Sequence, residues 1–169
     1  LWEFAGYWEA MWRLSGAYLM LVTTTLSVYY LPRLSELTEL HDIKFEIIQG
    51  YKIILPVAAV CATTIYVLRD TIIHLLFSAE FAPMAQLFAW QMVGDTFKIG
   101  GWILAYLMLG KAMMKLFVAS QVIFAALFFV LTTQFVGIFG LQGVAMAHAA
   151  NYAIYWLFMA LMIPRALRQ

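Results

Sequence analysis

The stretch from Met84 to Gly110 constrains the fold most, because it is long enough to cross a bilayer yet carries two charged residues near its middle. As a helix rising ~1.5 Å per residue it reaches about 40 Å, more than the roughly 30 Å of a hydrocarbon core. Asp95 and Lys98 fall in its central third, where an ionised group costs ~2.5–3.5 kcal/mol on insertion scales. Gln91, Asp95, Lys98 and Trp102 follow a 4-3-4 spacing and share one helix face. This face must therefore contact other helices or a water-filled cavity, and not lipid.

Apolar runs recur along the whole chain, which indicates an integral membrane protein. The 169 residues are 65% hydrophobic and 11% charged, with a mean hydropathy of +0.88, whereas soluble domains are about 45–50% apolar and about 25% charged. A single secretory signal does not explain apolar runs that recur. The start Leu1-Trp2-Glu3 is not typical of a natural N-terminus, so we expect this chain to be a piece of a longer protein. Cys61 is the single cysteine, which excludes an internal disulfide.

The apolar runs predict an all-α integral membrane fold with about five transmembrane helices and two short interfacial helices. Tryptophans crowd the start of the first span and tyrosines its end, as in the aromatic belts of membrane interfaces, and Pro32 is expected to stop it. The spans are expected at about residues 6–31, 51–68, 84–110, 113–135 and 141–163. The interfacial segments are expected at 33–50, which is amphipathic, and at 71–83, which is apolar but too short to span. Glycines at 137, 140 and 143 predict the last turn.

The positive charges predict how these spans are oriented. With five alternating spans, one side receives only Arg69 and, near a helix end, Arg13. The other side receives Arg33, Lys44, Lys52, Lys111, Lys115, Arg165 and Arg168. Because cytoplasmic loops carry an excess of Lys and Arg, the C-terminus is expected to be cytoplasmic and Leu1 outside. An outside start again favours further helices before Leu1.

Signatures of soluble enzymes are missing from the sequence. The three histidines lie in separate elements without metal-ligand spacing, and there is no phosphate loop, nucleophile elbow or dinucleotide fingerprint. The sequence therefore predicts no enzymatic activity, no cofactor and no metal site.

Asp95 and Lys98 are the main candidates for function. At i and i+3 they are able to pair on one helix face. Two interpretations stay open, an ion pair that locks helix packing or a site that contacts substrate or couples an ion, since intramembrane ionisable groups mark transport pathways. Gln91 is a further candidate because it shares their face.

Arg13, His148 and Asn151 complete the candidate residues for substrate binding or ion coupling. Arg13 lies one helical turn from Glu9, so it is either a snorkelling arginine paired with Glu9 or an arginine at a cavity entrance that binds phosphate through two donors. His148 and Asn151 share a face of the last span among small residues, where helix–helix hydrogen bonding is the alternative to a functional role.

Several segments resemble one family. AGYWEAMWRLSGAYLMLVTTTLSVYYLPRLSELTE and RDTIIHLLFSAEFAPMAQLFAWQMVGDTFKIGGWILAYLMLGK are similar to the C-terminal lobe of the Wzx-type polysaccharide flippases. Within the multidrug/oligosaccharidyl-lipid/polysaccharide exporter superfamily, the resemblance is to the branch that translocates lipid III or O-antigen units. LFAWQMVGD-x-x-K and LP-x-LS-x-LTE are its most specific elements, and it covers the chain from about Gly6 onward.

The resemblance implies a twelve-helix transporter of two six-helix lobes around a central cavity, in which residues 1–169 form the C-terminal lobe with helices eight to twelve. It implies that an undecaprenyl-pyrophosphate-linked oligosaccharide, an O-antigen or enterobacterial common antigen unit, is flipped from the cytoplasmic to the periplasmic leaflet of the bacterial inner membrane by alternating access. The implied partners are membrane lipids, this lipid-linked oligosaccharide, the N-terminal lobe of the same polypeptide, and polysaccharide polymerase and chain-length proteins, with no nucleic acid. Asp95 and Lys98 lie in the better-matched segment.

Two other functions stay open. One is an ion-coupled drug or cation antiporter of the same superfamily, in which Asp95 and Glu9 bind the substrate or ion. The other is a structural module of a glycan-assembly complex without transport of its own. An anionic lipid predicts net positive cavity walls and a cationic drug predicts acidic ones, but the intramembrane charges of Arg13, Lys98, Asp95 and Glu9 are balanced.

Overall fold

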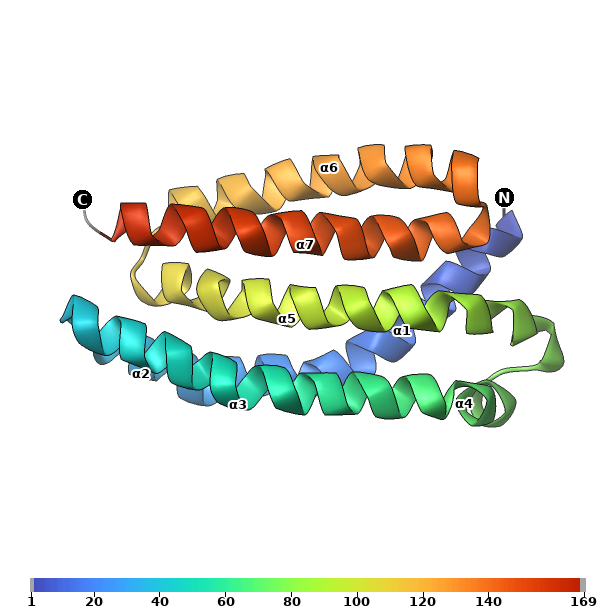
Figure 1. Cartoon of the computed structure of the whole chain (residues 1–169), viewed down its shortest axis with the longest axis horizontal. Helices are drawn as coiled ribbons and strands as arrows, with labels where there is room; N and C mark the ends of the chain where they lie inside the picture. Colours follow the sequence, from blue (N-terminus) through green and yellow to red (C-terminus); the bar gives the residue numbers. More distant parts are fainter. Residues whose placement is uncertain (1, 168–169) are drawn as a thin grey trace.

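The chain is helical throughout nearly all of the part that the structure describes. The computed structural model describes residues 2–167, so Leu1, Arg168 and Gln169 lie outside it, and with them the predicted outside position of Leu1. The elements in order are α1 (Trp2–Thr25), the π-helical turn η1 (Leu26–Tyr30), α2 (Leu31–Glu36), α3 (Leu40–Val67), α4 (Arg69–Leu76), the 3₁₀ helix η2 (Ala79–Leu87), α5 (Phe88–Gly110), α6 (Met114–Phe139) and α7 (Leu141–Ala166). Figure 1 shows α3, α5, α7 and α6 running alongside one another, with α1 crossing them at an angle.

Helix α5 lies at the centre of the bundle. It packs between α3 and α7, and α6 packs against α7 (Figure 1). Thirteen of its 23 residues are buried, so protein surrounds most of this helix, including most of its polar face. Its apolar residues Ile103 and Leu107 join a core cluster with Leu26 and Leu34 of the first helical segment and Met159 of α7.

Glycines allow α5 to approach α7 closely. A Cβ on Gly94 would lie 3.0 Å from Cα of Ala149 and would collide with the ring of His148. A Cβ on Gly101 would lie 2.6 Å from the ring of Tyr155. Small residues let helix backbones come together in this way. This close approach holds His148 directly against α5.

The expected stop at Pro32 is wrong, because the helical segment continues through this residue to Glu36. Proline lacks an N–H, and its ring clashes with the carbonyl of residue i−4 in a regular α-helix. The turn before it widens instead into a π-helix, in which the N–H of Leu31 donates to the carbonyl of Leu26. The wider turn makes room for the proline ring and lets the helix continue.

The separate helix expected over residues 33–50 is replaced by the single helix α3, which runs without a break from Leu40 to Val67. Ile47 and Ile54, on either side of the expected boundary, pack against the same core cluster that contains Ile43. The apolar stripe of the amphipathic part therefore continues into the apolar part, and one helix buries both. Whether the first turns of α3 lie at a membrane interface stays a prediction.

The other expected boundaries move by a few residues. The segment expected at 71–83 is divided between α4 and η2, and the helix expected to begin at residue 84 begins as α5 at Phe88. The fourth expected span extends to Phe139. Pro164 lies inside α7 and does not end it.

Among residues 2–167, four helical segments have the length and hydropathy of membrane spans. They are Trp2–Glu36, Leu40–Val67, Met114–Phe139 and Leu141–Ala166. Helix α5 is not among them, because Gln91, Asp95 and Lys98 lower its hydropathy. Its 23 residues reach about 35 Å, which is enough to cross a core of roughly 30 Å. A fifth span at α5 therefore remains a prediction.

Candidate functional site

A fully buried carboxylate, that of Asp95, links three helices. From α1, the hydroxyl of Tyr18 donates to its Oδ2 at 2.8 Å, and Ser15 Oγ donates to the same oxygen. Gln91 Nε2, one turn earlier on α5, donates to Oδ1 at 3.1 Å, and His148 Nε2 of α7 lies 3.0 Å from Oδ1. Both carboxylate oxygens are thus satisfied, and each has a partner from another helix.

Of the two interpretations left open for Asp95 and Lys98, the structure does not support the ion pair. Within the described part of the chain Lys98 makes no ion pair. Its Nζ lies 5.0 Å from the ring centroid of Trp102 and 5.0 Å from that of Tyr152. The donors of α1 and α7 satisfy the carboxylate, while the long lysine stem carries the ammonium to these two rings, which attract it by cation–π interaction. The cation is therefore separate from the acid.

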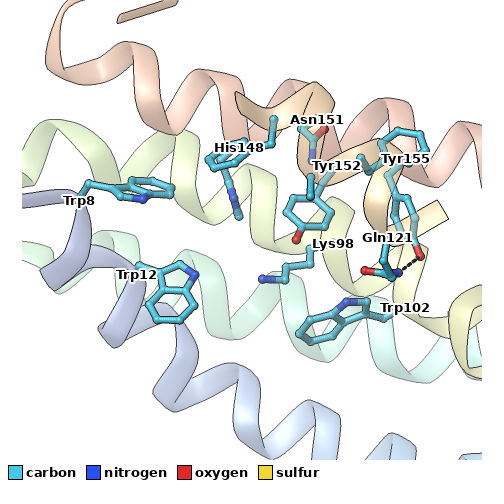
Figure 2. Close-up of a pocket in the computed structure, with 12 residues that line it drawn as sticks. Trp8, Trp12, Lys98, Trp102, Gln121, His148, Asn151, Tyr152 and Tyr155 are labelled. Carbon is cyan, nitrogen blue, oxygen red and sulfur yellow. Dashed lines mark hydrogen bonds between the residues drawn. The ribbon is translucent and has the colours of Figure 1, made fainter. Parts of the chain in front are cut away.

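Lys98 borders a cavity of about 290 Å³ that is lined by residues of α1, α5, α6 and α7. Figure 2 shows the ammonium among indole and phenol rings. The aromatic wall includes Trp8, Trp12, Trp102, Tyr152 and Tyr155. Among the residues that line this cavity in the described chain, Lys98 is the one Lys, Arg, Asp or Glu. Its charge gives the cavity a net positive wall.

A second cavity of about 300 Å³ lies between α1 and α5. Lys98, Trp12 and Trp102 border both cavities, and the second one also touches Ser15 and Asp95. Lys98 thus lines both the aromatic cavity and the cavity that reaches Asp95.

Two amides line the aromatic cavity (Figure 2). Gln121 of α6 donates from Nε2 to the hydroxyl of Tyr155 at 3.1 Å. Asn151 of α7 is buried, and among the described residues its Oδ1 has no hydrogen-bond partner. A buried acceptor without a partner costs about 1–3 kcal/mol. The acceptor of Asn151 is therefore costly to leave unpaired.

Arg13 lies apart from this site. Its Nη2 is 2.6 Å from Oε1 of Glu9, and both side chains are exposed. The structure thus brings together five of the six predicted residues. Gln91, Asp95 and His148 form the carboxylate network, while Lys98, His148 and Asn151 line the aromatic cavity.

Three partners of Asp95 and Lys98 were not among the residues predicted from the sequence. Ser15 and Tyr18 were not recognised as partners of Asp95, although their spacing of three places both hydroxyls on one face of the first helix. Tyr152 was not recognised as a partner of Lys98, and no local pattern distinguishes it from the other tyrosines. Between residues 2 and 167, no group of three or more His, Cys, Asp or Glu is arranged to hold a metal ion.

Comparison with known proteins finds two similar curated sequences. The chain is 38% identical over 155 residues to the lipid III flippase of Escherichia coli (strain K12), and equally similar to the lipid III flippase of Shigella flexneri. Each match covers 92% of this chain and 37% of the relative, so the chain spans a little over a third of the length of these proteins. No family model and no solved structure matches.

Proposed function

Because this chain is a homologue of the lipid III flippases over 92% of its length, we propose that it is part of a transporter that flips a lipid-linked oligosaccharide across the bacterial inner membrane. The proposed cargo is an undecaprenyl-pyrophosphate-linked oligosaccharide, either an O-antigen or an enterobacterial common antigen unit. It moves from the cytoplasmic to the periplasmic leaflet by alternating access.

In this proposal the helices form the C-terminal lobe of a two-lobed, twelve-helix transporter, and α5 is the fifth span. The buried polar face of α5 supports this arrangement, because α1 and α7 shield it from lipid. Arg33 lies in α2, Lys111 in the connection from α5 to α6 and Arg165 near the end of α7, and these three parts of the chain lie on the same side of the bundle (Figure 1). Their positive charge favours a cytoplasmic position for that side. The N-terminal lobe of the same polypeptide would complete the transport cavity, and polysaccharide polymerase and chain-length proteins are the proposed further partners.

The single observation that favours an anionic cargo is the position of Lys98. Its ammonium lies in a cavity with no other Lys, Arg, Asp or Glu on the wall among the described residues, and no carboxylate pairs with it there. A partly desolvated cation binds phosphate or carboxylate strongly. Lys98 is therefore assigned to an anionic group of the cargo.

The antiporter alternative needs free carboxylates to bind a cationic drug. Asp95 instead accepts hydrogen bonds from four residues, and Glu9 is paired with Arg13. This arrangement favours the anionic cargo. The carboxylate network of Asp95 and His148, which joins three helices, is the proposed site of ion coupling within the flippase.

The test replaces Lys98 in the full-length protein, expressed in cells that lack the native transporter. Lys98→Ala should insert normally but lower surface polysaccharide about tenfold or more, because a hydrogen bond to a charged group contributes about 1.5–3 kcal/mol and 1.4 kcal/mol is a factor of ten. Lys98→Arg keeps the charge and should restore part of the export. Lys115→Ala, which removes an exposed lysine from α6, should export normally. Wild-type polymer levels with Lys98→Ala would refute the assignment.

A further inference from the structure

We propose that the aromatic cavity between α1, α5, α6 and α7 is a subsite for one sugar ring of the cargo. A ring hydroxyl forms a hydrogen bond with the side-chain amide of Asn151, and the anionic group next to the ring contacts Lys98. This inference rests on the proposed function and goes beyond it by assigning a part of the cargo to these residues. We call the cavity the sugar subsite.

The walls of the sugar subsite match a sugar ring better than the other parts of the cargo. Trp8 and Trp12 of α1, Trp102 of α5 and Tyr152 of α7 surround it (Figure 2). Sugar rings present apolar C–H faces that pack on aromatic rings, and their hydroxyls need polar partners, which indole and phenol groups also supply. A pyrophosphate by itself favours several cations or N–H donors, and a polyprenyl tail needs none. A wall of rings with one cation and two amides is suited to a glycan.

The size of the cavity favours a single ring. Its volume of about 290 Å³ lies at the lower limit of ligand pockets, which measure about 300–1,000 Å³. Trp12 is 57% exposed, so the cavity is open beside α1. The remaining sugars of an oligosaccharide are therefore able to extend out of the lobe on that side.

Asn151 supplies the polar contact that selects for a hydroxyl. Asn151 lines the subsite, and its buried Oδ1 has no hydrogen-bond partner among the described residues. A site built to pair with a hydroxyl discriminates strongly against ligands that lack it, because the buried group is then left unpaired. A substitution of Asn151 should therefore affect the binding of sugar and not the binding of the lipid pyrophosphate.

The experiment measures ligand binding to the purified full-length protein in lipid nanodiscs. Three probes are compared: undecaprenyl pyrophosphate without sugar, the same lipid carrying the oligosaccharide of the source organism, and that oligosaccharide released from the lipid. Asn151→Leu, similar in size, should weaken binding of the two glycan probes about fivefold or more, the effect of one lost hydrogen bond, and leave the sugar-free lipid unchanged. Trp102→Leu, which removes part of the aromatic wall, should show the same selectivity.

Thr132→Val is the matched control. In the described part of the chain, Thr132 Oγ1 is also buried without a hydrogen-bond partner, but the residue does not line the sugar subsite. No probe should therefore bind differently to this variant. Lys98→Met identifies the anion. If the anionic group is on the sugar ring, Lys98→Met should weaken binding of the released oligosaccharide. If the anionic group is the pyrophosphate, Lys98→Met should weaken binding of the sugar-free lipid. Unchanged binding of both probes would overturn the role of Lys98. Thermal unfolding checks that each variant is folded.

The outcomes separate this inference from the proposed function. One outcome is that Asn151→Leu and Trp102→Leu weaken binding of the sugar-free and the sugar-carrying lipid equally, and another is that they leave binding of both unchanged. In either case the cavity is not a sugar subsite, although the protein still binds its cargo. If the wild-type protein binds neither lipid, the proposed function is refuted, and the sugar subsite with it.

Discussion

One added methyl group at Gly94 should loosen the contact between α5 and α7. A Cβ there would lie 3.0 Å from Cα and 3.1 Å from N of Ala149, and would collide with the ring of His148. The histidine ring can rotate away, but the backbone of Ala149 moves only with α7. Rotation of His148 also breaks its 3.0 Å contact with Asp95. The substitution therefore strains both the packing and the carboxylate network.

The expected cost of Gly94→Ala follows from these contacts. Overpacking costs about 1–3 kcal/mol, and losing a hydrogen bond to a charged group costs about 1.5–3 kcal/mol. Alanine regains up to about 1 kcal/mol because it favours the helix more than glycine does. The free energy of unfolding should fall by about 2–4 kcal/mol in total, and export in complemented cells should fall with it.

The assay is unfolding of the full-length protein in mixed micelles, with Gly6→Ala as the matched control. Gly6 lies in α1, and nothing lies within 4 Å of the position its Cβ would take, so alanine should stabilise the protein by up to about 1 kcal/mol. If Gly94→Ala is as stable as Gly6→Ala and exports normally, α5 and α7 do not approach as closely as the structure indicates.

Two further substitutions test the helix junction and the carboxylate network. Gly140 joins α6 to α7 with φ +61° and ψ −135°, a conformation that costs other residues about 1–3 kcal/mol. Gly140→Ala should therefore lower the thermal unfolding midpoint. Gly137→Ala should not lower it, because nothing lies within 4 Å of the position that a Cβ on Gly137 would take. Asp95→Leu leaves the hydroxyls of Ser15 and Tyr18 without their acceptor. The free energy of unfolding should fall by about 1–3 kcal/mol for each unpaired donor. Asp95→Asn, which keeps an acceptor oxygen, should lower it less.

The sequence predicted the helical segments of the bundle, and the structure corrected where they begin and end. Hydropathy and proline positions indicate where apolar helices lie, but not how a helix passes a proline. Pro32 was expected to end a helix, and the π-turn before it, which depends on the packing of Leu26 and Tyr30, lets the helix continue. The break expected near Gly50 is absent because one apolar stripe serves both parts of α3.

The sequence by itself determined that the protein is a helical membrane protein and that the residues around Asp95 and Lys98 must be shielded from lipid. Length and composition suffice for this, because the cost of a charge in hydrocarbon depends little on the rest of the fold. Only the tertiary structure decided how each charge is satisfied. The partners of Asp95 lie as far as 80 residues away in the chain, and they meet it because small residues bring α7 against α5 while α1 crosses beside them. Local spacing left open whether Asp95 pairs with Lys98, whereas helix packing places Asp95 in the carboxylate network and Lys98 at the aromatic cavity.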